Sequence, residues 1–308
     1  MFRALVLAAL LPGEAAGAQT LNIDGPAGPL AGTLARSTGA QAALLLPGSG
    51  PTDRDGNQPA AGLHTDAYRL LAEALAARGL SVLRIDKRGL GDSGGDGNAV
   101  SLAGYRADTA AWAAALRAET GADCVWLIGH SEGGLIALFS ADLPGICGLV
   151  LLAAPGRALG PILVQQIADH PLHGLHAPAV ARVVADISVG LAPDLSDLPE
   201  ALAAIFRPET LGYLTELIAT DPAELARGIG LPILAVTGDT DAQIPAEAAQ
   251  ALVAANPAIR SVTLPGMTHM LKQVAPGDFA AGARSYTDPA MPLHGDLVPA
   301  IASFILGD

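Results

Sequence analysis

The segment VWLIGHSEGG, residues 125–134, decides the fold that we expect for this chain. An apolar run rich in β-forming residues leads into Ser131, and the helix-like run GLIALFSA (134–141) follows it. In a nucleophile elbow, a serine occupies a sharp turn between a strand and a helix, and glycines on either side allow close backbone approach. The order strand, turn, helix therefore predicts a serine hydroxyl held above the end of a sheet.

A second segment has the same G-x-S-x-G spacing and centres on Ser93, in Gly91–Gly95. It spells the nucleophile signature of chymotrypsin-like proteases, but it lies in a glycine-rich loop with no strand before it and no helix after it. A motif counts only in its predicted structural context, so we favour Ser131. For the Ser93 loop we expect a position under the sheet edge, with Asp86 and Arg88 forming a structural ion pair.

Outward from residues 125–134, apolar runs alternate with helical runs. Strands are predicted at 42–48, 80–86, 124–129, 148–154, 232–238 and 260–266, and helices at 67–79, 102–121, 247–255 and the C-terminus. This alternation is typical of a parallel sheet covered on both faces. The alternating runs LNIDG and LAGTLARS near the N-terminus predict an additional antiparallel pair.

The stretch 157–230 breaks the alternation, because it contains helical runs and no strand-like run. We expect it to be a helical cap over the carboxyl end of the sheet, where ligands bind in open α/β sheets. The domain prediction is therefore a signal peptide at 1–18, a core formed by 19–156 and 231–308, and a cap at 157–230.

A nucleophilic serine needs a base. His269 follows the last predicted strand, which places it at the same end of the sheet as Ser131. His130 is expected to pack at the turn and point away from the serine, while His294 has no strand to position it. His64 is expected to cap the first helix or to approach the substrate.

The base needs a carboxylate to orient it, and the loop after strand 232–238 offers Asp239 and Asp241. We favour Asp241, which lies further from the strand, over Asp239. The order Ser131, Asp241, His269 is the order expected for this elbow. No acid follows strand 148–154.

Two backbone N–H groups are expected to form an oxyanion hole: that of Glu132, directly after the serine, and that of Ser49, in the loop after strand 42–48. Each such donor typically contributes about 3 kcal/mol of transition-state stabilisation.

Composition limits the possible partners. The chain has 308 residues, is 51% hydrophobic and carries a formal net charge of −13. This charge argues against a nucleic-acid or anionic-membrane partner, because phosphate binding needs clustered Lys and Arg. The oligomeric state does not follow from composition.

The N-terminus has the three parts of a signal peptide: a positive start, a short apolar run, and an A-x-A site ending at Ala18. We expect cleavage after Ala18, export to the periplasm or outside, and no membrane anchor. Cys124 and Cys147 each begin an apolar run, so in an oxidising compartment they form either a disulfide or two buried thiols.

Five segments together resemble the α/β-hydrolase superfamily over essentially all of the mature chain. They are PGSGPTDRDGN (47–57), RIDKRGLGDS (84–93), GHSEGG (129–134), GDTDAQIP (238–245) and PGMTH (265–269). They look like bacterial esterases related to serine aminopeptidase-like and dienelactone-hydrolase-like members. The resemblance implies an α/β-hydrolase fold, with an eight-stranded mostly parallel sheet, helices on both faces and a helical cap insertion. It also implies ester hydrolysis without a metal or cofactor.

Three features depart from that pattern or stand apart from it. Pro47 replaces the usual histidine before the oxyanion glycine, and the loop that follows carries charged residues 53–55, which we expect to brace against Arg88. In the cap, His170, His173 and His176 recur at a spacing that zinc sites use. Because proline and glycine interrupt this run and no fourth ligand lies nearby, we expect no metal there.

The sequence thus predicts a serine carboxylesterase acting on a small-molecule ester with a small, largely apolar acyl group. One alternative is a peptidase or amidase with the same triad, in which the cap acids Glu209, Glu216 and Asp221 would bind a peptide terminus. Another is a non-catalytic binding protein on a hydrolase scaffold, which is disfavoured because no triad residue is missing.

Overall fold

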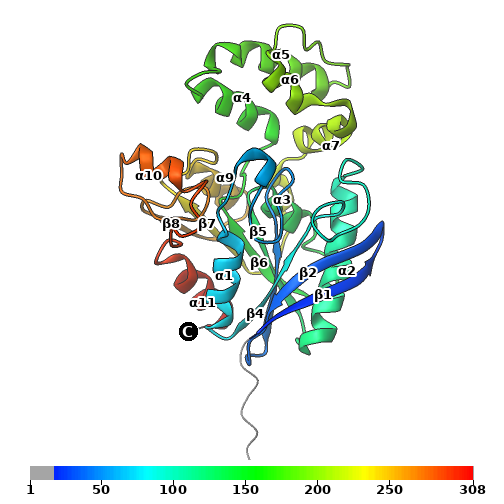
Figure 1. The fold of residues 1–308 in the computed structure, drawn as a ribbon, viewed down its shortest axis with the longest axis vertical. Coiled ribbons are helices and arrows are strands. Elements are labelled where there is room, and N and C mark those ends of the chain that lie inside the picture. Colours follow the sequence, from blue (N-terminus) through cyan, green and yellow to red (C-terminus); the bar gives the residue numbers. More distant parts are fainter. Residues whose placement is uncertain (1–16, 308) are drawn as a thin grey trace, which may run out of the picture.

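One eight-stranded sheet forms the centre of the molecule (Figure 1). The computed structural model describes residues 17–307, so all but the end of the predicted signal peptide lies outside the described residues. The strand order is β1-β2-β4-β3-β5-β6-β7-β8. The strands are β1 (Ala18–Gly25), β2 (Gly28–Ala35), β3 (Gln41–Leu46), β4 (Leu80–Ile85), β5 (Val125–His130), β6 (Ile146–Leu152), β7 (Ile233–Gly238) and β8 (Arg260–Leu264).

The sheet is mostly parallel, as predicted. β1 and β2 form an antiparallel hairpin, and β2 also pairs antiparallel with β4, while every later pairing is parallel. Because the strands from β3 to β8 run in one direction, the loops after β3, β5, β7 and β8 all emerge at one edge of the sheet. That edge carries every residue predicted to take part in catalysis.

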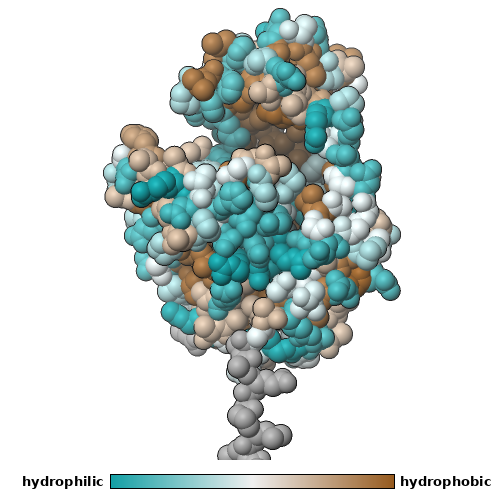
Figure 2. Space-filling model, viewed as in Figure 1, coloured by the Kyte–Doolittle hydropathy of each residue, from teal (hydrophilic) through white to brown (hydrophobic). Residues whose placement is uncertain are grey.

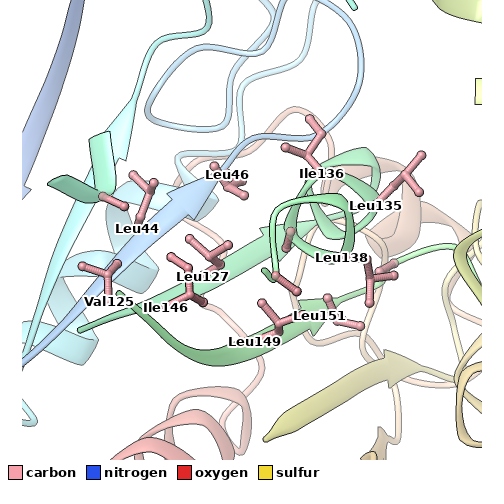
Figure 3. Packing of buried hydrophobic residues seen from close by; sticks show 14 of the residues in the cluster. Leu44, Leu46, Val125, Leu127, Leu135, Ile136, Leu138, Ile146, Leu149 and Leu151 are labelled. Atoms are coloured by element: carbon pink, nitrogen blue, oxygen red, sulfur yellow. The ribbon is translucent and has the colours of Figure 1, made fainter. Parts of the chain in front are cut away.

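Helices cover both faces of the sheet. Alternate residues of the buried strands face opposite layers: Leu44 and Leu46 of β3 belong to one core cluster and Leu45 to the other. The first cluster includes residues of α2 (Leu102–Thr120), α3 (Glu132–Phe139) and α9 (Glu247–Ala255), and Figure 3 shows its centre around β5 and α3. The second includes residues of α1 (Ala67–Ala76) and α11 (Leu297–Leu306).

Between β6 and β7 the described chain contains only helices. They are α4 (Leu159–Asp169), η2 (Gly174–His176), α5 (Ala177–Ser188), α6 (Glu200–Ala203), η3 (Ala204–Phe206), α7 (Pro208–Ala219) and α8 (Pro222–Arg227). Helices α4 to α7 share a separate apolar cluster and lie beyond the carboxyl edge of the sheet (Figure 1). Helix α8 packs against α3 and α9 instead. Residues 157–230 as a functional cap stay a prediction.

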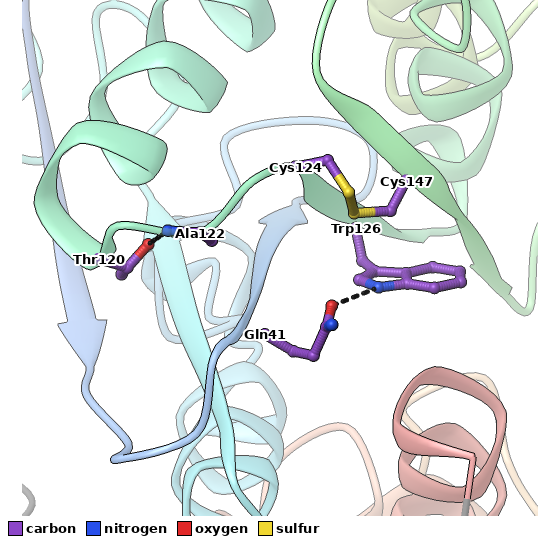
Figure 4. The surroundings of a disulfide bond; sticks show 6 residues. All are labelled: Gln41, Thr120, Ala122, Cys124, Trp126 and Cys147. Atoms are coloured by element: carbon purple, nitrogen blue, oxygen red, sulfur yellow. Dashed lines mark hydrogen bonds between the residues drawn. A yellow bond between two sulfur atoms is a disulfide. The ribbon is translucent and has the colours of Figure 1, made fainter.

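A disulfide joins Cys124 and Cys147, with their Cα atoms 5.3 Å apart (Figure 4). It lies at the amino ends of the paired strands β5 and β6, the opposite edge of the sheet from Ser131. Beside it, the Trp126 indole donates a hydrogen bond to Gln41. Of the two states left open by the sequence, the structure therefore has the disulfide. Among the described helices, none combines the length and apolar character needed to cross a bilayer.

Candidate active site

Ser131 lies on a strained turn between β5 and α3. Its φ of 52° and ψ of −121° are uncommon for a residue with a side chain, and such strain typically costs about 1–3 kcal/mol. The turn is held by two backbone hydrogen bonds, from the Ser131 N–H to the Leu152 carbonyl and from the Gly134 N–H to the Ser131 carbonyl, both 2.9 Å. The paired β6 strand and the first turn of α3 thus enforce the conformation.

The glycines of the elbow are required by close backbone contacts. A Cβ atom on Gly129 would lie 2.2 Å from the Gly133 carbonyl oxygen, and one on Gly133 would lie 2.2 Å from the Leu46 carbonyl oxygen. The helix after the serine therefore passes against both β3 and β5. This arrangement explains why the sequence has Gly two residues before and two residues after Ser131.

His269 and Asp241 meet at the same edge of the sheet. The imidazole Nδ1 of His269, in the loop after β8, lies 2.8 Å from Oδ2 of Asp241, in the loop after β7. Oδ1 of Asp241 accepts the N–H groups of Gln243 (2.8 Å) and Ile244 (2.9 Å), and both side chains of the pair are buried. Because a carboxylate accepts, Nδ1 carries a proton, so in the neutral imidazole the lone pair is on Nε2.

Two polar atoms at this edge of the sheet are free of protein partners. Within residues 17–307, neither the Ser131 hydroxyl nor His269 Nε2 has a hydrogen-bond partner. His130, adjacent to Ser131 in the chain, lies against His269, and the centroids of the two imidazole rings are 4.8 Å apart. The serine and the histidine–aspartate pair therefore belong to one site.

The two predicted oxyanion donors flank the serine. Glu132 is the first residue of α3, where backbone N–H groups have no intrahelical partner. On the other side, a Cβ on Gly48 would lie 3.4 Å from the Ser131 Cβ, so the loop after β3 runs beside the elbow. The Ser49 N–H has no hydrogen-bond acceptor among the described residues.

His130 is buried and links three parts of the site. Its Nε2 lies 2.8 Å from the carbonyl oxygen of His269, so Nε2 must be the donor and Nδ1 an acceptor. The Tyr68 hydroxyl, 2.7 Å from Nδ1, then donates to it and in turn accepts the Gly48 N–H at 2.9 Å. Burial, with a smaller effect from His269, lowers the pKa of His130 to about 3, so its imidazole stays neutral. The expectation that His130 packs at the turn agrees with this position.

Ser93 has a structural environment. Its hydroxyl accepts the Ala31 N–H and donates to the Asp86 carbonyl, both at 2.9 Å, which ties its loop to β2. The predicted Asp86–Arg88 ion pair is wrong. Asp86 pairs with Arg54 instead, and Arg88 pairs with Asp108 at 2.8 Å.

The charged loop 53–55 braces against other partners than the Arg88 expected from the sequence. Arg54 binds Asp86 and, at 2.8 Å, Asp92, while Asp55 forms an ion pair with Arg84. The hydrogen bond from Arg54 to Asp86 raises the pKa of the guanidinium. The loop is a brace, as expected, but it joins to β4 and its following turn.

The remaining candidates have structural contacts. Asp239 accepts the Gly266 N–H at 2.6 Å, so it ties the loop after β7 to the loop after β8. His294 is buried and donates from Nε2 to the Pro265 carbonyl at 3.0 Å. His64 is exposed, and its backbone N–H bonds to the Tyr286 carbonyl.

No metal site is evident in the described part of the chain, where no three His, Cys, Asp or Glu side chains are grouped to hold an ion. In the predicted cap, the rings of His170 and His173 stack on one another, with centroids 4.6 Å apart. The Nδ1 of His170 accepts the Leu172 N–H, which fixes that ring in the turn after α4.

A hollow separates helices α4 to α7 from the core, and hydrophobic residues line part of it (Figure 2). A cavity of about 680 Å³ lies where α4 faces the loop after β7, and it is lined by Ile162, Ile244, Ala248 and Asp241 among others. Polar groups also line it, notably Arg157 and Gln166. Small-molecule sites in proteins commonly have such a mixture and such a size.

Sequence reasoning missed three residues around the predicted oxyanion hole. Tyr68 and Lys87 are buried and bind Gly48, and the partly buried Tyr213 packs against Tyr105. Lys87 was visible as one of only two lysines, in the segment RIDKRG, but nothing in the sequence places its ammonium group. Tyr68 and Tyr213 lie in ordinary helical runs, so their contacts emerge only from the packing of α1 and α7.

The strand order, the elbow on a strained turn and the histidine–aspartate pair after the last two strands define an α/β hydrolase. The serine aminopeptidase S33 family model matches residues 61–273, more than half of the chain. The chain belongs to this family of α/β serine hydrolases.

Individual relatives are more distant. Over 213 residues the chain is 25% identical to esterase EstD of Thermotoga maritima, a match that covers 66% of this chain and 47% of EstD. The chain thus spans about half the length of that relative. The Pyrococcus furiosus esterase Pf2001 has a similar fold, with a TM-score of 0.57 and 17% identity over 98% of this chain and 97% of that one. Est1E of Butyrivibrio proteoclasticus, solved with ferulic acid bound, also has a similar fold. Its TM-score is 0.56, with 17% identity over 87% of this chain and 96% of that one.

Proposed function

We propose that this protein is a serine carboxylesterase in which Ser131, His269 and Asp241 form the catalytic triad. The observation that carries the proposal is the Asp241–His269 hydrogen bond beside an elbow serine whose hydroxyl is free. The names of EstD and Pf2001, both esterases, support the choice of an ester bond.

The reaction proceeds in two halves. Ser131 Oγ attacks the acyl carbon while its proton passes to His269 Nε2, and the N–H groups of Ser49 and Glu132 bind the resulting oxyanion. The intermediate collapses as the bond to the alcohol oxygen breaks and His269 returns the proton to that oxygen. Water then attacks the acyl-enzyme with His269 as base, and the carboxylic acid leaves as the proton returns to Ser131.

The substrate is a small ester with a largely apolar acyl group. The hydrophobic lining of the hollow between α4–α7 and the core supports this class, since apolar surface favours apolar ligands. Within residues 157–230, helices α4 to α7 act as the cap that shapes this space. No cofactor or metal takes part, because the triad supplies the base and the backbone amides supply the electrophilic groups.

The enzyme acts outside the cytoplasm, after removal of residues 1–18. The Cys124–Cys147 disulfide supports export, because disulfides persist mainly in oxidising compartments.

The peptidase alternative loses part of its basis. Two of the three cap acids considered for a peptide terminus have structural contacts: Glu216 accepts the Leu102 N–H at 2.7 Å, and Asp221 accepts the Ala223 N–H at the start of α8. Glu209, in the first turn of α7, is the acid that is left.

A paired assay tests the proposal. We expect the protein to hydrolyse p-nitrophenyl acetate and butyrate faster than any aminoacyl-p-nitroanilide, and a fluorophosphonate probe to label Ser131. Ser131→Ala should abolish both, while Ser93→Ala should keep the labelling. Preference for anilides would favour the peptidase, and unchanged turnover by Ser131→Ala would exclude the mechanism.

A further inference from the structure

Lys87 is a buried lysine beside the predicted oxyanion hole. It follows β4, is 5% exposed, and donates from Nζ to the Gly48 carbonyl oxygen at 2.7 Å. Nζ also lies 3.6 Å from Glu132 Oε1 and 5.6 Å from the centre of the Tyr105 ring. Burial lowers the pKa of Lys87, whereas Glu132 acts in the opposite direction.

The carbonyl that Lys87 binds belongs to a functionally important peptide. Gly48 C=O and Ser49 N–H are the two ends of one amide, and in a planar trans amide these bonds point in opposite directions. A cation on the oxygen therefore fixes where the N–H points. It also draws electron density toward the oxygen, which makes the N–H a stronger donor.

The same ammonium group is linked to the second donor. Glu132 supplies the other predicted oxyanion N–H, and its carboxylate is the counter-ion of Lys87. The neighbouring peptide is held too, because the Gly48 N–H binds Tyr68. Lys87 thus connects the loop after β3 with the start of α3, on the side of both segments that faces the protein interior.

We propose that Lys87 is a positioning residue of the oxyanion hole, which orients and polarises the Ser49 N–H through the Gly48 carbonyl. The proposal rests on the esterase function above. Removing an entire oxyanion donor typically costs about 100- to 1,000-fold in kcat. Since Lys87→Met leaves the donor in place but unsupported, we expect a loss on the order of 10- to 100-fold.

The test compares Lys87→Met with Arg88→Met. Arg88 is the adjacent residue and also a buried cation, but it binds Asp108 and the Gly104 carbonyl of α2, away from the loop after β3. For each variant, active sites are titrated with a fluorophosphonate, and kcat and KM are measured on p-nitrophenyl butyrate. Affinity for a trifluoromethyl ketone is measured in parallel, because Ser131 adds to the ketone carbonyl to form a tetrahedral oxyanion.

For Lys87→Met we expect kcat per titrated site to fall 10- to 100-fold with KM within threefold, and ketone affinity to fall in proportion. Arg88→Met should lower the stability of the protein but leave kcat per titrated site and ketone affinity at wild-type values. In Lys87→Met the Glu132 carboxylate loses its counter-ion, which could itself cause misfolding. The double variant Lys87→Met/Glu132→Gln removes that carboxylate and so separates misfolding from lost positioning. Its kcat should stay low. If Lys87→Met or the folded double variant kept wild-type kcat and ketone affinity per site, the inference would be wrong. A wild-type protein with neither turnover nor Ser131 labelling would instead overturn the esterase proposal, and this inference with it.

Discussion

At the scale of single residues, Asp241 and Asp239 differ in the groups that their carboxylate oxygens bind. Asp241 orients the imidazole with one oxygen and is itself fixed by two backbone amides, while Asp239 binds the backbone of Gly266. We expect Asp241→Asn to lower kcat by about 10⁴-fold, because an amide favours the wrong histidine tautomer.

Asp239→Asn is the matched control for that substitution. It keeps an oxygen that can accept the Gly266 N–H, so kcat should fall less than tenfold. Both variants are assayed on p-nitrophenyl butyrate after active-site titration. Equal losses in the two variants would contradict the assignment of Asp241.

His130 gives a pH prediction. Its pKa is about 3 in the folded protein and about 6.5 in the unfolded chain, so between these values the unfolded state binds the extra proton. Stability due to this residue is therefore complete above pH 6.5 and is lost as the pH falls toward 3, by about 1.4 kcal/mol per pH unit. In His130→Gln this component should disappear.

The measurement is the free energy of unfolding by urea at pH 7.0, 6.0, 5.0 and 4.0. Wild type and His64→Gln, which alters an exposed histidine, should give the same steep slope, and His130→Gln a slope shallower by about one proton. A His130→Gln slope that matches wild type would mean that His130 is protonated in the folded protein.

At the scale of elements, local patterns predicted most of the sheet. The buried strands β3 and β5 are continuous apolar runs, and their ends agree with the prediction to within two residues. Helix α10 (Phe279–Arg284) was missed, since six residues rich in Ala and Gly carry too short a pattern to identify.

What the sequence did not predict is the choice of partner across the fold. Arg54 and Arg88 were both expected near one another, yet each binds an acid on a different element. Long flexible side chains reach several partners, so the spacing of charges along the chain does not select among them. The positions of His269 and Asp241 were easier to predict, because each lies in the loop directly after a strand and the sheet order fixes where those strands end.

The disulfide is a local constraint on β5 and β6. Reducing it, or replacing both cysteines with serine, should lower the free energy of unfolding by about 3 kcal/mol, the value expected for a loop of this length. Because it lies at the opposite edge of the sheet from Ser131, kcat per titrated site should stay within twofold of wild type.

Urea unfolding with and without dithiothreitol checks the stability change, and the Cys124→Ser/Cys147→Ser variant should not respond to the reductant. A large loss of kcat in a fully folded, reduced protein would show that the two edges of the sheet are coupled.

At the scale of the whole molecule, helices α4 to α7 have their own apolar cluster but few polar links to the core. One link joins α7 to α2, where Glu216 accepts the Leu102 N–H and Tyr213 packs edge-on against Tyr105, with ring centroids 5.5 Å apart. Another joins α4 to the loop after β7, where Gln166 donates to the Gln243 carbonyl at 2.9 Å.

Cutting both polar links should loosen the cap without touching the triad. In Glu216→Ala/Gln166→Ala we expect faster limited proteolysis between residues 157 and 221, because local opening exposes the backbone. For p-nitrophenyl acetate, which fills little of the hollow, kcat/KM should stay within threefold of wild type. For p-nitrophenyl octanoate, which must contact the cap, KM should rise at least fivefold, since binding must then order the loosened cap helices.

The control is the exposed substitution Glu224→Ala on α8, whose carboxylate pairs only with Arg227 in the described chain. Equal KM changes for the short and long esters would mean that the cap does not bind the acyl chain.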